Sequence, residues 1–112
     1  MNVAILQGYI KDNLELRSDN EKAMVCFQIG VPRKYKAGNE RTIDYFNIEA
    51  QKGLAKWICK TFKQGDFIGV EGKLETNGNS VTLKATEIYF GNYNAEISES
   101  VTNGKKFVIK EK

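Results

Sequence analysis

The hydrophobic period of this chain switches from two residues to that of a helix and back again, and this order constrains the fold more than any other feature. In residues 23–31, AMVCFQIGV, apolar side chains occupy every second position, as a strand with one buried face requires. Between residues 51 and 63 the apolar residues recur at helical spacing, with lysines turned mostly outward. Residues 66–76 and 80–90 return to strand-like patterns. We therefore expect a β protein with one helix inserted among its strands.

Two more strands are predicted before the helix. The first covers residues 2–10, NVAILQGYI, where Gly8 permits a bulge or a sharp bend, and residues 14–17 are a candidate continuation of it. The other runs from residue 42 to about residue 50, and its alternation turns Tyr45 outward. The core face of that strand is expected to hold Phe46, Ile48 and Ala50.

Glycine and asparagine mark the ends of the later elements. Gln64-Gly65 stops the helix, because glycine accepts the left-handed conformation on which helices often end. Asn77-Gly78-Asn79 predicts a hairpin between the last two strands, since both residue types tolerate positive φ. A change of apolar phase near Glu87 predicts a bulge, and we interpret Gly69 and Gly72 as bends of a barrel.

The resulting order is strand, strand, strand, helix, strand, strand. This order predicts the all-β class and a five-stranded OB-fold barrel with one short α-helix between strands 3 and 4. A chain of 112 residues has room for one such domain. We place the OB-fold domain at residues 1–91 and a short flexible C-terminal tail at residues 92–112. A stray edge strand at the apolar cluster 107–109 is the alternative for part of that tail.

The composition argues against catalysis. Histidine is absent, which removes the commonest general base at neutral pH and the commonest zinc ligand. Cys26 and Cys59 match no ligand spacing, and we interpret them as small buried hydrophobic residues. No pattern brings two carboxylates together as a hydrolase would need. The sequence therefore predicts that the protein is not an enzyme, has no cofactor and has no metal site.

The chain also lacks the signals of a membrane or exported protein. No apolar run approaches the roughly 18 residues of a spanning helix. The first residues contain neither the basic region nor the cleavage site of a signal peptide. We predict a cytoplasmic protein with no membrane partner. The net charge of +3 does not identify a polyanionic partner by itself, because the placement of charges decides that question.

Residues 31–46, VPRKYKAGNERTIDYF, combine cations and aromatic rings on the connection between two predicted strands. Cations can follow the phosphates of single-stranded nucleic acid, and exposed rings can stack on its bases for about 1–3 kcal/mol each. Solvated charges at a hairpin tip are the alternative for the cations, and a subunit interface is the alternative for Tyr45. The loop residues concerned are Arg33, Lys34, Tyr35, Lys36 and Arg41.

Other basic and aromatic residues are less specific. Lys11, Lys73 and Lys84 lie on or near predicted strands, where they either extend the cationic track or protect sheet edges. Trp57 flanks the apolar stripe of the helix, so we assign it to packing.

Taken together, these segments resemble the bacterial single-stranded DNA-binding proteins, including forms carried by phages and mobile elements. The resemblance extends from Asn2 to about Gly91 and is carried by NVAILQGYI, VCFQIGVPRKY, TIDYFNI, LAKWICKTFKQG and FIGVEGKLET. It implies a homotetramer of OB-folds with single-stranded DNA wound over the outside, without base specificity. It also implies a protein that coats and protects single-stranded DNA in DNA replication, recombination and repair.

The resemblance also assigns roles to residues of this chain. It implies base stacking by Tyr35 and Tyr45, and phosphate contacts by Arg33, Lys34, Lys36, Lys52 and Lys73. With the loop cation Arg41, the predicted nucleic-acid-binding residues are Tyr35, Tyr45, Arg33, Lys34, Lys36, Arg41, Lys52 and Lys73.

The chain departs from the family pattern at three places. Gln51 stands where family members often have an aromatic residue, and the last hairpin is reduced to Asn77-Gly78-Asn79. The final residues, KKFVIKEK, are basic, which argues against recruitment of replication proteins by an acidic tail and favours a specialised phage or plasmid form. The basic end and the missing rings support an alternative function, an OB-fold protein-interaction module of the replication-restart type with weak nucleic-acid binding.

Overall fold

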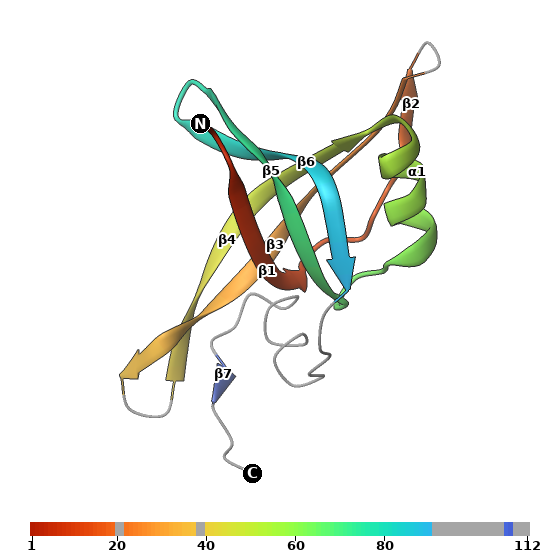
Figure 1. Cartoon of the computed structure of the whole chain (residues 1–112). Helices are drawn as coiled ribbons and strands as arrows, with labels where there is room; N and C mark the ends of the chain where they lie inside the picture. The colour runs from red at the N-terminus through yellow and green to blue at the C-terminus, as the bar shows by residue number, and fades with distance from the viewer. Residues whose placement is uncertain (20–21, 38–39, 91–106, 109–112) are drawn as a thin grey trace.

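The computed structural model describes residues 1–19, 22–37, 40–90 and 107–108, of which residues 19, 34–37, 40–41 and 107–108 are described by their backbone only. This part of the chain contains seven strands and one helix (Figure 1). In chain order they are β1 (Ala4–Ile10), β2 (Arg17–Asp19), β3 (Lys22–Ala37), β4 (Glu40–Gln51), α1 (Lys52–Thr61), β5 (Phe67–Asn77), β6 (Ser80–Phe90) and β7 (Phe107–Val108).

Five of the strands close into a barrel. Antiparallel pairing joins β4 to β3, β3 to β1, β1 to β5 and β5 to β6. The ring is completed by parallel pairing of residues 47–49 of β4 with residues 82–84 of β6. The helix α1 follows the third barrel strand and packs against β3 and β4. The predicted five-stranded OB-fold, with its helix between strands 3 and 4, is confirmed.

The barrel core consists of the apolar residues that the alternation assigned to it. Fully buried aliphatic side chains come from every barrel strand and from the helix, and burial of each contributes about 1.5–3 kcal/mol. They are Ile10, Val25, Ile29, Ile48, Ile58, Ile68, Val70 and Leu83. The prediction for Phe46 is wrong, because its side chain is 38% exposed. Pairing of β4 with β6 begins at Asn47, so Phe46 lies where the β3–β4 hairpin extends past the barrel (Figure 1).

Close strand contacts explain the barrel glycines. A Cβ atom at Gly72 would lie 1.9 Å from the carbonyl oxygen of Lys84, a distance that no side chain tolerates. Beside it the β5–β6 register shifts, and Thr86 is the extra residue of β6. The Thr86 hydroxyl donates a hydrogen bond to the carbonyl oxygen of Glu71 at 3.2 Å. The bulge predicted near Glu87 is thus confirmed, and it lies one residue earlier, at Thr86.

Several local predictions hold, and others need correction. Gly78 has a positive φ of 63° at the predicted hairpin. The helix stop predicted at Gln64-Gly65 is too late, because α1 ends at Thr61 with the extended residue Phe62 as its C-cap. Gly65, with a φ of 93°, lies in the turn that follows.

Residues 14–16 do not continue β1, since Arg17–Asp19 forms the separate strand β2, which pairs with β3. Cys26 is exposed rather than buried, because it lies on the outward side of β3.

The C-terminal prediction falls mostly outside the described residues. Of residues 92–112 only 107–108 are described, and they form β7, which pairs antiparallel with Glu40 and Arg41 of β4. The edge-strand alternative therefore applies to this short segment. Within the described residues, α1 is too short and too polar to cross a membrane.

The glycine contacts lead to a stability prediction. We expect Gly72→Ala to lower the free energy of unfolding by about 3 kcal/mol, because the new methyl group must push β6 away from β5. Gly53→Ala is the matched control, since a Cβ atom there meets no atom within 4 Å. In α1 that control should be neutral or stabilise by up to about 1 kcal/mol. Urea unfolding measures both, and equal stabilities would contradict the close contact at Gly72.

Candidate nucleic-acid interface

Outward side chains of β3, β4, β6 and β5 form one continuous surface, here called the outer strand face. The strand register places Cys26 opposite Glu49, Glu49 beside Lys84, and Lys84 opposite Lys73. A parallel row of the same surface runs from β3 to β5 through Gln28, Asn47, Thr82 and Glu75. Two residues of β4, Tyr45 and Gln51, complete the outer strand face.

Tyr45 lies on this face beside a cation. Its side chain is half-buried and is not part of the core cluster, which agrees with the predicted outward direction. The ammonium nitrogen of Lys11 lies 4.8 Å from the centroid of the Tyr45 ring. Burial raises the pKa of the Tyr45 hydroxyl above its ordinary value. An aromatic ring and a cation thus share one place on the outer strand face.

Two amide side chains next to Tyr45 are held by hydrogen bonds. The Gln28 amide nitrogen donates to the Asn47 side-chain oxygen at 3.0 Å, and the Asn47 amide nitrogen donates to the Val81 carbonyl oxygen at 3.2 Å. The backbone N–H of Gln28 donates to an Asp12 carboxylate oxygen at 2.7 Å. Amides both donate and accept hydrogen bonds, so this pair offers neutral polar contacts to base edges. Gln28 is not among the binding residues predicted from the sequence, although the alternation in residues 23–31 turns its side chain outward.

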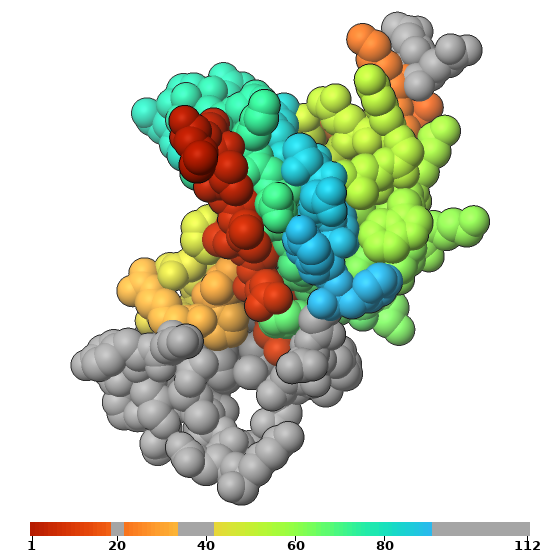
Figure 2. Space-filling model, in the orientation of Figure 1, coloured from red at the N-terminus to blue at the C-terminus, as the bar shows by residue number. Residues whose placement is uncertain are grey.

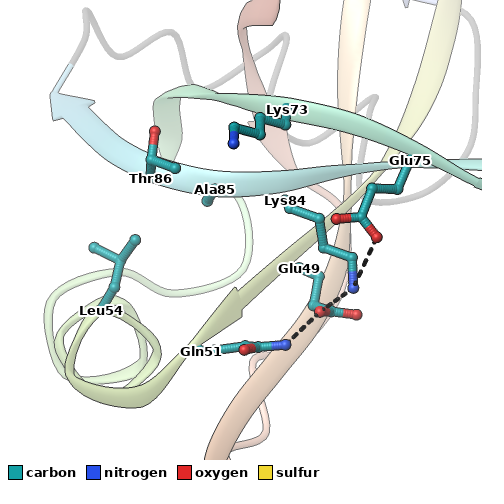
Figure 3. Close-up of a pocket in the computed structure, with 8 residues that line it drawn as sticks. All are labelled: Glu49, Gln51, Leu54, Lys73, Glu75, Lys84, Ala85 and Thr86. Carbon is teal, nitrogen blue, oxygen red and sulfur yellow. Dashed lines mark hydrogen bonds and ion pairs between the residues drawn. The ribbon is translucent and has the colours of Figure 1, made fainter. Parts of the chain in front are cut away.

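A hollow of about 460 Å³ lies at the other end of the face (Figure 3). There the Lys84 ammonium forms an ion pair with Glu49 and lies 3.9 Å from a Glu75 carboxylate oxygen. The hydrogen bond to Glu49 is the main reason why the pKa of Lys84 is raised. The hollow is lined by Glu49, Gln51, Leu54, Lys73, Glu75, Lys84, Ala85 and Thr86. Glu49 also lines a second hollow of about 320 Å³ toward β3.

Three cations and three carboxylates lie on or beside the outer strand face. The cations Lys11, Lys73 and Lys84 are accompanied by three carboxylates, which are Asp12, Glu49 and Glu75. The carboxylates beside the lysines are not part of the cationic track predicted from the sequence. Within the described residues, no group of three or more histidine, cysteine or acidic side chains is arranged to hold a metal ion.

The geometry of the barrel and its outer strand face does not identify a protein family by itself. The family follows from the sequence comparison. Residues 1–95 match the sequence profile of the Single-strand binding protein family. The chain belongs to the single-strand binding protein family. It is accordingly a single-stranded DNA-binding protein, as the sequence analysis predicted.

Relatives of this single-strand binding protein agree with the assignment. Single-stranded DNA-binding protein 1 of Lactococcus lactis is 26% identical over 107 residues, which cover 94% of this chain and 71% of that protein. A deletion mutant of the single-stranded DNA-binding protein from Thermus aquaticus superposes with a TM-score of 0.70 at 21% identity, over 84% of this chain and 42% of that one. The small single-stranded DNA-binding protein from Streptomyces coelicolor gives a TM-score of 0.68 at 20% identity, over 80% of this chain and 91% of that one. At these identities the structural likeness shows the fold.

The structure places the predicted binding residues in different settings. Tyr45 and Lys73 lie on the outer strand face, and Lys52 is exposed next to Gln51 at the start of α1. Arg33 is engaged in a two-bond ion pair with Asp44, at 2.8 and 2.9 Å, which lowers the pKa of that carboxyl group. The side chains of four predicted residues lie outside the described part of the structure, namely Lys34, Tyr35, Lys36 and Arg41.

Trp57 is part of a small aromatic cluster at the end of β6. Its ring makes edge contacts with Phe62 and Phe90, each at 5.8 Å between ring centroids. Phe62 and Phe90 stack on each other at 5.3 Å. These contacts agree with the packing role predicted for Trp57, whose side chain packs at the surface and stays 38% exposed.

Lys52 has a strained backbone at the junction of β4 and α1. Its φ of 58° lies in the left-handed region, and it is the one non-glycine residue there among those described. For an L-residue this conformation costs about 1–2 kcal/mol. Gln51, the residue before it, provides no side-chain cap to the helix. The junction therefore keeps a cation beside the outer strand face at some cost in stability.

Two substitutions separate the backbone strain of Lys52 from its charge. We expect Lys52→Gly to be more stable than Lys52→Ala by about 1 kcal/mol, because only glycine relieves the positive φ. Both variants lack the ammonium group, so their affinities for single-stranded DNA should be equally reduced. Urea unfolding and oligonucleotide titration give the two quantities. A Lys52→Ala variant as stable as Lys52→Gly would refute the strain.

Proposed function

We propose that this single-strand binding protein holds DNA across the outer strand face, with the Tyr45 ring stacked on an unpaired base. The observation that carries the proposal is the position of Tyr45 outside the core, beside the Lys11 ammonium. Rings and cations in combination favour single strands, because a duplex keeps its bases stacked on each other. Lys52 and Lys73 are proposed to contact phosphates on the same face.

The proposal includes the β3–β4 hairpin beyond the barrel. Its backbone continues from the outer strand face, so cations and a ring at its end would prolong the same track. We include Arg33 in this track, since its ion pair with Asp44 is exposed and such pairs are weak enough for a phosphate to replace the carboxylate. The other residues proposed for the hairpin are Lys34, Tyr35, Lys36 and Arg41.

The expected binding has no sequence specificity and involves no catalysis. Every base has an aromatic face, and the Gln28 and Asn47 amides can serve as donors or acceptors. We propose that the protein coats and protects single-stranded DNA in replication, recombination and repair. We propose that it does so in the cytoplasm.

A homotetramer is part of the proposal, and the edge of β1 supports it. On its β3 side, β1 is paired only at Tyr9 and Ile10 in the described structure. Val3, just before β1, and Ile5 in β1 are 60% and 61% exposed, and Figure 2 shows the start of β1 at the surface beside β5. An open strand edge with apolar side chains is a template for pairing with another chain. A second copy of this protein is the partner that we propose for it.

The stacking role of Tyr45 is tested by removing its ring. We expect Tyr45→Ala to weaken binding to a labelled oligo(dT) by about 5- to 150-fold, which corresponds to one lost base stack. Tyr45→Phe is the matched control, which keeps the ring and should bind within about twofold of the original protein. Fluorescence anisotropy at fixed salt gives the affinities. An unchanged affinity of Tyr45→Ala, or equal binding of duplex DNA by the original protein, would refute the proposed face.

The oligomer is tested by placing a charge on the β1 edge. We expect light scattering to give the mass of a tetramer for the original protein and a smaller mass for Ile5→Asp, because burying an unpaired carboxylate in an interface is costly. Val81→Asp is the control, since Val81 is also an exposed apolar strand residue but lies on β6. A tetramer that persists in Ile5→Asp would exclude the β1 edge as the contact.

A further inference from the structure

Glu49 is held more firmly than a solvated surface carboxylate. Its side chain is 14% exposed and forms the ion pair with Lys84 (Figure 3). The Gln51 amide nitrogen donates to the same carboxylate oxygen at 2.9 Å, and the Cys26 thiol donates to the other oxygen at 4.0 Å. A carboxylate that has lost most of its hydration depends on such donors. The outer strand face therefore holds a firmly positioned carboxylate beside the hollow of Figure 3.

Lys84 is the cation that this carboxylate neutralises, because the other carboxylate near it, that of Glu75, is more distant at 3.9 Å and more exposed. The Lys84 side chain is 33% exposed, and it lies directly opposite Lys73 across the β5–β6 pair. Two like charges in this position repel each other, and Glu49 compensates one of them. No described side chain pairs with Lys73. With Glu49 in place, the Lys73 ammonium is thus available to bind a phosphate, whereas the Lys84 ammonium is already paired.

The pair lies in the path that the proposed DNA contact defines. Tyr45 and Glu49 belong to the same outward row of β4, four residues apart, which is about 13 Å along a strand. A single strand stacked on Tyr45 and following this row toward α1 passes over the Glu49–Lys84 pair. Its phosphates then meet a lysine that already has an anionic partner.

We propose that Glu49 competes with DNA phosphates for Lys84 and so sets the affinity and the salt dependence of single-strand binding. This inference rests on the proposed function. A phosphate that uses Lys84 must displace the carboxylate. Because the Glu49–Lys84 pair has no net charge, contact with the intact pair neutralises no phosphate and releases none of the cations condensed on the DNA. The intact pair thus makes binding weaker and less sensitive to salt.

The test neutralises Glu49 and measures binding of oligo(dT) at several salt concentrations. For Glu49→Gln we expect the slope of log K against log salt to steepen by about 0.7, the value for one more phosphate contact on a single strand. The affinity near 0.1 M salt should rise about two- to fivefold, the range of one exposed ion pair. Glu49→Thr, also uncharged and suited to a strand, should behave alike. Thermal unfolding checks that both variants are folded.

A double-variant cycle asks whether Glu49 acts through Lys84. In the Lys84→Gln background, adding Glu49→Gln should leave the salt slope unchanged, because no ammonium group is released. A slope change that persists in this background would overturn the proposal, since Glu49 would then act by general repulsion. Glu87→Gln, on the part of β6 beyond the bulge, alters the net charge equally and should not change the slope. An equal slope change in Glu87→Gln would also overturn the proposal.

A second oligonucleotide separates electrostatic competition from base contact. The Glu49→Gln effect should be the same on oligo(dC) as on oligo(dT), and an effect limited to oligo(dC) would overturn the proposal. Failure of this proposal on Glu49 is distinguishable from failure of the proposed function. Tyr45-dependent binding with unchanged slopes in both Glu49 variants would leave the DNA-binding face intact and remove only the role of Glu49.

Discussion

The parallel pairing of β4 with β6 is the contact on which both the core and the binding face depend. On the inner side it brings together Ile48 and Leu83, which are both buried. On the outer side the same pairing brings Glu49 to Lys84 and Asn47 to Thr82. Without it the sheet would remain open between these strands, and the outer strand face would be divided. The pairing that closes the barrel therefore also assembles the outer strand face.

The outer strand face combines few rings with charges of both signs. Single-strand binding without sequence preference needs flat groups for the bases and cations for the phosphates, but the two need not be equally strong. Among the described residues of this face, Tyr45 supplies the aromatic ring, and the Gln28–Asn47 pair supplies neutral hydrogen-bonding groups. Carboxylates accompany the cations. Such a face favours contacts to the bases, whose strength depends less on salt than contacts to phosphates do.

Features that depend on neighbouring residues could be predicted from the sequence. The Gly78 turn and the Thr86 bulge each arise from a few consecutive residues. One error arose where position relative to distant elements matters. Phe46 follows the apolar phase of β4 but lies beyond the last residue that β6 covers. The error for Cys26 is of another kind, because the alternation of residues 23–31 already turns position 26 outward.

The sequence by itself determined which way Tyr45 points and which elements form the barrel, because side-chain alternation and helical period are properties of each segment's own backbone. It also carried the family resemblance that the match over residues 1–95 shows to be correct. Only the tertiary structure decided that Glu49 meets Lys84, 35 residues away along the chain. That contact depends on strand order and register, which are fixed only when the barrel closes and its core packs.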